Sequence, residues 1–351
     1  MAKKWKRLEK SRIKEFLNEL HASYEIWLPY LEEDKWRFKE YDIEKEIDLP
    51  SSFVHDSIKR LFLPRRKRIM EFNKHKKWPV VPVSPPAANR LLMGIHACDG
   101  AALQYLDRVF IDSPYKDTFY EAERNRTVIA GIQCDRMESM CHCTDRGISP
   151  EHRDGMDIIM SRTKNGYLLQ AITEKGHTIL NNRILAETDE QPVKKEWSDQ
   201  RYPLATPEAF LESYSVDIWR DVMKYCLTCG ICTFGCPTCT CFHVADELYK
   251  NEGERVAVWD SCQFRSYSRM AAGHNPRART FERIKNRIMD KFAYSFLRYG
   301  QISCTGCGRC VVSCPVKCSL PETATLISNT IKQKKPSLAS SDAVSRSKPE
   351  Q

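Results

Sequence analysis

Short apolar runs and amphipathic stretches alternate along the first half of the chain. Apolar residues at near-helical spacing predict one helix over residues 3–20 and a second over residues 57–73, where Pro64 marks a start or a break. Apolar runs of strand-forming residues, bounded by Gly, Pro, Asn or Asp, predict five strands, at residues 79–83, 91–95, 127–132, 157–161 and 167–172. A helix is expected near residues 100–107, so residues 1–196 predict an α/β domain.

The second half of the chain follows a different pattern. Residues 197–213 contain two prolines and little periodicity, which is typical of a linker. Residues 214–330 are rich in cysteine, and within them residues 280–298 place Phe and Ile side chains on one face of a predicted helix. The polar residues 331–351 are expected to form a disordered tail. The predicted fold class is α+β, an α/β domain followed by a helical cysteine-rich domain.

Composition excludes several classes of protein. The chain of 351 residues is 42% hydrophobic and 29% charged, which excludes a wholly disordered protein. No run approaches the roughly 18–20 apolar residues that a membrane-spanning helix needs. The basic N-terminus is not followed by the apolar stretch of a secretory signal. A cytoplasmic protein is therefore the expectation.

Sixteen cysteines carry most of the remaining information. In a reducing compartment, a set of this size indicates metal binding more than disulfide formation. They fall in three groups: Cys98, Cys134, Cys141 and Cys143; then Cys226, Cys229, Cys232, Cys236, Cys239, Cys241 and Cys262; then Cys304, Cys307, Cys310, Cys314 and Cys318.

Two copies of one cysteine motif, C-x2-C-x2-C-x3-C-P, begin at Cys226 and Cys304. Three thiolates at every third position wrap around one iron–sulfur cube, and the fourth ligates the other cluster in two-cluster ferredoxins. The expected ligand sets are Cys226, Cys229, Cys232 and Cys314 for one [4Fe–4S] cluster, and Cys304, Cys307, Cys310 and Cys236 for the other. Zinc is the alternative, but its sites use one or two CxxC pairs with tetrahedral closure. The two motifs together predict a ferredoxin-like domain, in which residues 237–303 form a long insertion between them.

The chain resembles a known family at several places. These are YCLTCGICTFGCPTCTCF (225–242), WDSCQF (259–264), MAAGHNPR (270–277), RYGQISCTGCGRCVVSCPV (298–316), MGIHACDGAALQYLDRVF (93–110) and VIAGIQCDRMESMCHC (128–143). They are similar to the 4Fe-4S dicluster electron-transfer subunit of anaerobic sulfite reductase and to the beta subunit of cytoplasmic sulfhydrogenases. The resemblance implies an electron-transfer subunit that passes electrons from a flavin-containing partner to a catalytic subunit. Two departures are His96-Ala97, where Arg-Pro is expected, and the extra thiol of Cys318.

The four N-terminal cysteines suggest a third cluster. Cys98 and Cys134 each follow a predicted strand, and parallel neighbouring strands would bring both thiols to one carboxyl edge, where open α/β sheets bind ligands. Cys141 and Cys143 follow on a short loop that would close the site. The alternative is four unrelated reduced cysteines, some of them buried as small apolar residues.

The last four cysteines, Cys239, Cys241, Cys262 and Cys318, have two interpretations. They either form a fourth cluster or pack as single thiols beside the other two. No Gly-rich nucleotide or flavin motif and no Ser/His/Asp arrangement stands out. The leading hypothesis is thus an iron–sulfur subunit that relays single electrons between a flavoprotein (NAD(P)H-binding) subunit and a sulfite reductase or [NiFe] hydrogenase subunit, without catalytic residues of its own. The alternative is a reductase that acts on a disulfide or sulfur compound near Cys239, Cys241 and Cys262.

Basic residues are concentrated in three places. The net charge is +9, and residues 265–298 are strongly basic, as are residues 65–68 and 74–77. Such runs are a solvated face or a docking patch for an acidic subunit, or else a nucleic-acid site. Because bound [4Fe–4S] clusters are anionic, basic residues beside the cysteine motifs do not by themselves indicate nucleic acid. The expected partners are therefore the other subunits, with no nucleic acid and no membrane span.

Overall fold

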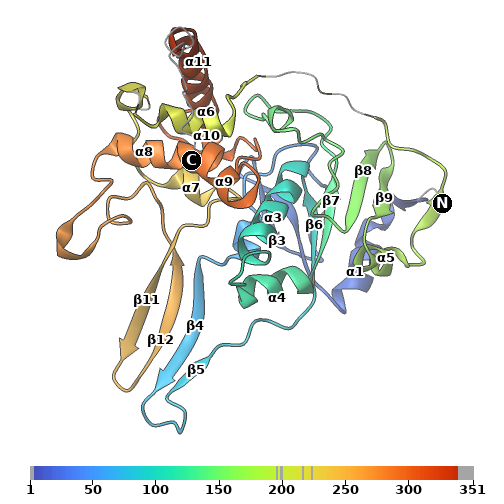
Figure 1. The fold of residues 1–351 in the computed structure, drawn as a ribbon. Coiled ribbons are helices and arrows are strands. Elements are labelled where there is room, and N and C mark those ends of the chain that lie inside the picture. The colour runs from blue at the N-terminus through green and yellow to red at the C-terminus, as the bar shows by residue number, and fades with distance from the viewer. Residues whose placement is uncertain (1–3, 195–196, 198–200, 216, 223, 339–351) are drawn as a thin grey trace, which may run out of the picture.

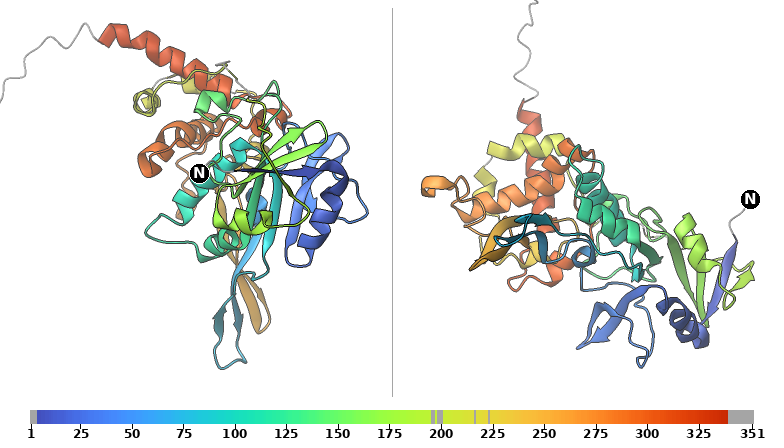
Figure 2. Two further views of the ribbon diagram at one scale, coloured as in Figure 1. Left: turned by 90° about the vertical axis from the view of Figure 1, so that its right-hand side faces the viewer. Right: turned by 90° about the horizontal axis from the view of Figure 1, so that it is seen from below.

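The computed structural model describes residues 4–194, 197, 201–215, 217–222 and 224–338 (Figure 1). It contains two sheets and a cluster of helices, in agreement with the predicted α+β class. The two views of Figure 2 show the large N-terminal sheet on one side of the molecule and the C-terminal helices on the other. Among the described helices, none is long and apolar enough to cross a membrane.

The N-terminal part is built on an eight-stranded sheet with the order β10-β1-β9-β8-β7-β6-β2-β3. Its strands are β1 (Trp5–Glu9), β2 (Glu25–Glu32), β3 (Lys35–Glu40), β6 (Arg90–Ile95), β7 (Thr127–Ile132), β8 (Ile158–Thr163), β9 (Gly166–Ala171) and β10 (Ala186–Thr188). The central strands β2, β6, β7 and β8 are parallel, whereas the outer strands pair antiparallel. The predicted parallel pairing of the strands that precede Cys98 and Cys134 is confirmed.

Both faces of this sheet are covered by apolar side chains. Leu91 and Met93 of β6 belong to one buried cluster, and Leu92 and Ile95 belong to the other. This explains why the parallel strands read as continuous apolar runs instead of alternating ones. The helices of this part are α1 (Ile13–His21), α2 (Lys59–Phe62), α3 (Ala97–Phe110), α4 (Thr118–Arg126) and α5 (Glu174–Leu180).

Two of the predicted helices are partly wrong. Residues 5–9 form β1, which pairs with β9 and β10, and only the second half of residues 3–20 is helical. The stretch 57–73 contains the short α2 and then β4 (Arg66–Asn73), with Pro64 between them. In both cases pairing with a distant strand outweighs the local helical spacing. The five predicted strands and the helix after Cys98 are confirmed.

The C-terminal part is a group of helices around its own apolar core, which includes Trp219, Ile288 and Phe292. The helices are α6 (Pro207–Glu212), α7 (Ile231–Phe234), α8 (Thr280–Met289), α9 (Ser295–Tyr299), α10 (Arg309–Val312) and α11 (Leu320–Leu338). A π-helical turn, Asp290–Tyr294, joins α8 to α9, so the helix predicted at residues 280–298 is confirmed as one continuous element. The predicted tail, residues 331–351, begins within α11, and residues 339–351 lie outside the described residues.

Short 3-10 turns complete the helical elements: Lys10–Arg12, Thr144–Arg146, Ser213–Ser215, Asp217–Arg220 and Ala271–Gly273.

A second sheet joins distant parts of the chain. Its order is β11-β12-β4-β5, with β11 (Phe242–Tyr249), β12 (Glu252–Trp259) and β5 (Val80–Pro82) beside β4. One hairpin therefore comes from the N-terminal half, and the other comes from the insertion between the cysteine motifs. Figure 1 shows this sheet projecting from the body of the molecule.

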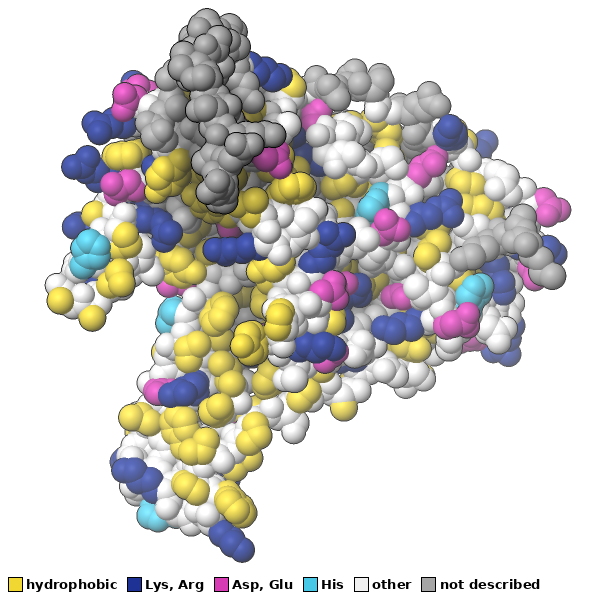
Figure 3. Space-filling model, viewed as in Figure 1, with side chains coloured by type: hydrophobic (Ala, Val, Ile, Leu, Met, Phe, Trp, Pro, Cys, Tyr) yellow, Lys and Arg dark blue, Asp and Glu magenta, His cyan; other side chains and the backbone are white. Residues whose placement is uncertain are grey.

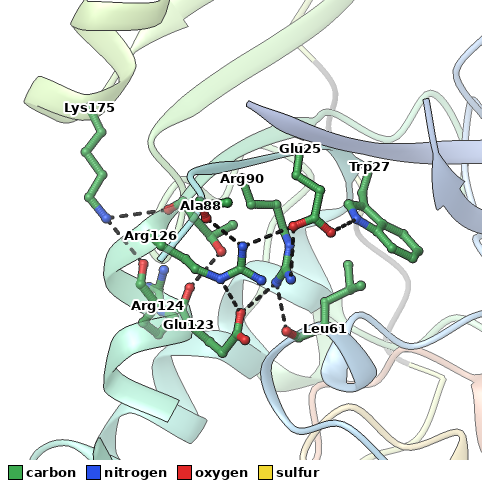
Figure 4. Close-up of polar contacts among 10 residues, drawn as sticks. Glu25, Trp27, Leu61, Ala88, Arg90, Glu123, Arg124, Arg126 and Lys175 are labelled. Carbon is green, nitrogen blue, oxygen red and sulfur yellow. Dashed lines mark hydrogen bonds and ion pairs between the residues drawn. The ribbon is translucent and has the colours of Figure 1, made fainter. Parts of the chain in front are cut away.

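Four charged side chains close the amino ends of the parallel strands (Figure 4). Arg90 and Arg126 both contact Glu123, at 2.9 and 2.8 Å, and both contact Glu25, at 3.7 and 3.1 Å. Arg90 also donates to the Leu61 carbonyl. Arg126 likewise donates to the Ala88 carbonyl. Because two cations face two carboxylates, the charges of this buried network balance one another.

Candidate metal centres

The first cysteine set lines a single hollow. Cys226, Cys229 and Cys232 lie on the loop before and within α7, and Cys314 reaches the same hollow from the end of the second motif. Gly230 has a left-handed backbone (φ 75°), and a Cβ there would lie 2.8 Å from the Phe264 ring. The loop therefore needs glycine to turn tightly around the hollow.

The second set lines another hollow in the same crossed manner. Cys304, Cys307 and Cys310 come from the second motif, and Cys236 comes from the end of the first. The ring Nε2 of His142 lies 3.8 Å from the Cys304 sulfur. Burial raises the pKa of the Cys304 thiol, but this contact with His142 lowers it to about 6. The local chemistry thus favours thiolate at Cys304.

The N-terminal cysteines gather at the carboxyl edge of the large sheet. Cys98 follows β6, Cys134 follows β7, and Cys141 and Cys143 lie on the loop after it. Burial raises the pKa of all four thiols, and neighbouring thiols raise it further in each case. The structure brings these four residues together, and Cys98 and Cys141 also lie within electrostatic reach of Cys307 in the second set.

The loop that carries Cys141 and Cys143 packs directly on the second cysteine motif. The His142 N–H donates to the Gly306 carbonyl at 2.9 Å. A Cβ at Gly306 would lie 2.3 Å from the His142 carbonyl, and one at Gly308 would lie 2.7 Å from the Met140 carbonyl. Only glycine at both positions permits this approach, so the N-terminal set and the second set share a wall of backbone.

A buried ion pair also stabilises the contact between the N-terminal cysteine set and the second cysteine motif. Arg309, inside the second motif, binds both carboxylate oxygens of Asp99, the residue after Cys98, at 2.8 and 2.9 Å. Their side chains are 1% and 0% exposed. The Arg309 Nε donates to the Val54 carbonyl at 2.9 Å. A bidentate, fully buried pair of this kind fixes the orientation of the two cysteine loops.

Three further cations lie buried between the cysteines. Arg287 lines both the first and the second hollow and donates to the Cys232 carbonyl at 2.9 Å. Lys291 donates to the Thr238 hydroxyl at 2.8 Å, and Lys59 donates to the Cys239 carbonyl at 2.9 Å. None of their hydrogen bonds within the described residues goes to a carboxylate.

The electrostatics of these cations depend on the thiols. Burial alone would lower the pKa of Arg287, but the thiolates of Cys232 and Cys239 raise it well above its usual value. The same holds for Lys291 beside Cys236 and Cys239. For Lys59 burial prevails, and its pKa is lowered. Buried charges require nearby charge of the opposite sign. Cysteine thiolates supply most of it at Arg287 and Lys291, and the Asp290 carboxylate adds to it at Lys291.

The remaining cysteines separate into two places. The Cys239 N–H donates to the Cys236 carbonyl at 3.5 Å, beside the second set. The Cys262 thiol lies close enough to Cys241 to lower the pKa of Cys241 to about 6. The Cys318 N–H, in contrast, donates to the Cys314 sulfur at 3.2 Å, beside the first set. The structure thus brings Cys241 and Cys262 together and places Cys318 with other cysteines.

The donor set fits anionic iron–sulfur clusters. Each of the two hollows is lined by four motif cysteines, drawn from both motifs, and Cys318 also lines the first hollow. Arg287 lines both hollows and has a buried Nε without a partner in the described structure. An anionic cluster would supply the negative charge that this guanidinium lacks. Within the described residues, no group of three or more His, Cys, Asp or Glu side chains converges on the position of a single metal ion.

Lys59, Asp99 and His142 are site residues that sequence reasoning missed. Lys59 lies more than 160 residues from the nearest motif cysteine in the chain, and no local signal distinguishes it from a surface lysine. The sequence could have indicated Asp99 and His142 as site residues, because each is adjacent to one of the N-terminal cysteines.

Comparison with known proteins agrees with this geometry. A family model for a 4Fe-4S dicluster domain matches residues 225–318. The chain is 27% identical over 321 residues to the protein named sulfhydrogenase 2 subunit beta of Pyrococcus furiosus, covering 86% of this chain and 92% of that protein. The resemblance to the sulfhydrogenase beta subunit family is confirmed. No solved structure matches the chain.

The chain is therefore an iron–sulfur electron-transfer protein with a 4Fe-4S dicluster domain. The matched residues contain both cysteine motifs and the insertion between them, and the similarity to the sulfhydrogenase subunit extends well into the N-terminal sheet.

The basic run at residues 65–68 is largely ion-paired: Arg66 contacts Glu247 and Glu254, and Lys67 contacts Asp117.

Proposed function

We propose that this chain relays single electrons from a flavin-containing subunit to the catalytic subunit of a cytoplasmic hydrogenase or sulfite reductase complex, or in the reverse direction. The observation that supports it most is the contiguity of three cysteine sets. Arg287 lies between the first and second sets, and the Gly306–Gly308 backbone lies between the second and N-terminal sets. A chain of neighbouring sites suits conduction better than substrate chemistry.

Each set has a proposed occupant. We assign one [4Fe–4S] cluster to Cys226, Cys229, Cys232 and Cys314, and a second to Cys236, Cys304, Cys307 and Cys310. A third belongs to Cys98, Cys134, Cys141 and Cys143. When bound, such clusters supply one-electron changes of valence. Residues 1–196 and 214–330 are the two proposed domains, and Asp99–Arg309 is a bond across them.

The protein residues around the sets favour the reduced state. Arg287 and Lys291 are buried cations beside the second set, and positive charge stabilises the more negative of two redox states. The chain thereby sets the reduction potentials of its clusters, while its partner subunits carry out the reaction.

Iron analysis tests the third cluster. We expect the double variant Cys141→Ser/Cys143→Ser to contain about four fewer irons per chain than the wild type after anaerobic purification. Cys262→Ser is the matched control, because Cys262 belongs to none of the three sets and lines neither the first nor the second hollow. The iron content of this control should stay unchanged. Equal iron in the double variant and the wild type would remove the third cluster from the proposal.

Anaerobic affinity purification tests the complex. The tagged chain should recover two partners, a flavin-containing subunit with its flavin and a catalytic subunit with its metal centre, both identified by mass spectrometry. Recovery of a monomer that retains its iron but has no redox partner would contradict the proposed relay.

One observation favours a second function. Cys239 and Cys241 line an additional hollow with Trp259, and Cys241 contacts the Cys262 thiol. Reduction of a disulfide or another sulfur compound at this place by the isolated chain, with an artificial electron donor, would support a reductase. Loss of that activity in Cys241→Ser, with iron retained, would separate it from the relay.

A further inference from the structure

The projecting four-stranded sheet has two different faces. Cross-strand partners in an antiparallel sheet point to the same side. Residues on one side are Phe242, Val244, Asp246 and Leu248 of β11, with their partners Trp259, Ala257, Arg255 and Gly253, and then Lys67, Met70 and Phe72 of β4 and Val80 and Pro82 of β5. We call this side the apolar sheet face.

The opposite side is polar and bonded to itself. It carries His243 and Glu247 of β11 with Glu254 of β12, and Arg66 and Arg68 of β4. Arg66 contacts both Glu247 and Glu254, and Arg68 contacts Glu254. Salt bridges of this kind are typical of a side that remains in water.

The apolar sheet face is strongly exposed. Leu248 is 75% exposed, and Val80, Val244 and Phe242 are each at least half exposed. Figure 3 shows hydrophobic side chains gathered along the projecting sheet, with few charged ones among them. A small antiparallel sheet gains most of its stability by burying one apolar face. Exposed contiguous apolar surface of this kind marks an interaction site.

The face leads to the cysteines. At its base Lys67, Phe242, Ala257 and Trp259, all from the apolar side, line the same hollow as Cys239 and Cys241. The Cys239 N–H in turn donates to the carbonyl of Cys236, a member of the second cysteine set, at 3.5 Å. A protein that lay on the face would therefore approach the redox site along one continuous surface.

We propose that the apolar sheet face is the docking surface for another subunit of the oxidoreductase complex, through an uncharged apolar patch on that subunit. This rests on the proposed function. The charges on the face are paired: Arg255 with Asp246 at 2.7 Å, and Lys67 with Asp117 at 2.7 Å. With no net charge left to attract an acidic or basic surface, complementarity requires an apolar one. The chain's own residues 339–351 are almost entirely polar or small, so they do not supply it.

The test compares two neighbouring positions of β11 on opposite faces. Leu248→Asp places a carboxylate on the apolar sheet face, and Tyr249→Asp, at 67% exposure, places one on the polar face. Subunits recovered with the tagged wild-type chain are separated, identified by flavin or metal content, and titrated against each variant. For one of these subunits, we expect Leu248→Asp to raise the dissociation constant at least tenfold, and Tyr249→Asp to leave it within twofold. Val244→Asp should repeat the loss.

Each other outcome has a definite meaning. Iron content and circular dichroism of every variant must match the wild type, and Val244→Asp replaces Leu248→Asp if the latter fails to fold. Equal affinity of wild type, Leu248→Asp and Val244→Asp overturns this inference and leaves the relay standing. Sedimentation that shows a wild-type homodimer broken by Leu248→Asp, with subunit binding unchanged, overturns it in favour of a second copy. If the iron-loaded wild type binds no subunit, the proposed function and this inference both fall.

Discussion

The molecule buries cationic side chains in two regions, and it neutralises them in different ways. At the amino ends of the parallel strands, Arg90 and Arg126 face Glu25 and Glu123, so the two positive charges are neutralised by carboxylates. Between the cysteine sets, Arg287 and Lys291 are equally buried but hydrogen-bond only carbonyl and hydroxyl oxygens. The cations of the first region are therefore neutralised by the protein's own carboxylates. Those of the second region are stable only beside anionic cysteine sites.

Removing the clusters should break this comparison most strongly. After anaerobic chelation we expect residues 280–299, which carry Arg287 and Lys291, to lose hydrogen-exchange protection by on the order of several kcal/mol, because buried cations lose their counter-charge. Strands β6 and β7, with the balanced network at their amino ends, should keep theirs. Equal protection of residues 280–299 with and without iron would contradict the idea that the clusters neutralise these cations.

Arg309→Met should have the next largest effect. It leaves the Asp99 carboxylate buried without a partner and should lower the free energy of unfolding by about 3–5 kcal/mol. Anaerobic urea denaturation measures the change. The double variant Asp99→Asn/Arg309→Met is the control, since removing both charges should recover part of the loss. A double variant less stable than Arg309→Met would show that the charge is not the cause.

Glu123→Gln tests the self-contained network. Arg90 and Arg126 would retain only Glu25, and we expect a loss of about 2 kcal/mol in unfolding free energy, the scale of a hydrogen bond to a charged group. Iron content should not change. On the same helix, Glu121 contacts Lys116 at 3.4 Å near the surface, so Glu121→Gln should stay within about 0.5 kcal/mol. Loss of iron in Glu123→Gln would mean that the two regions are coupled.

The main expected effect of Arg287→Met is on the reduction potential of a cluster, and not on the free energy of unfolding. Loss of positive charge disfavours the reduced state, so we expect a cluster potential lower by roughly 60 mV, which is about 1.4 kcal/mol for one electron. Anaerobic titration followed by electron paramagnetic resonance measures it. Arg298→Met, an exposed position on the same helical segment, is the control and should leave the potential unchanged. Matching shifts in both variants would point to net charge and not to position.

Much of the local structure was predictable from the sequence. The strands at 91–95, 127–132, 157–161 and 167–172 are confirmed, since runs of apolar residues between Gly, Pro, Asn or Asp reflect burial on both faces of a sheet. The two cysteine motifs and the 4Fe-4S dicluster domain were also predictable, because cluster ligation depends on spacing within a short loop.

The chain by itself determined which residues turn around a hollow and which segments become strands, since these depend on neighbours a few positions away. Only the tertiary structure decided that residues 5–9 are a strand, that β4 pairs with β12, and that Lys59, Arg287 and Arg309 are buried. A lysine or arginine in sequence is typical of a surface. Its burial becomes stable only when folding brings distant anionic groups to it, and the local sequence pattern does not indicate such long-range contacts.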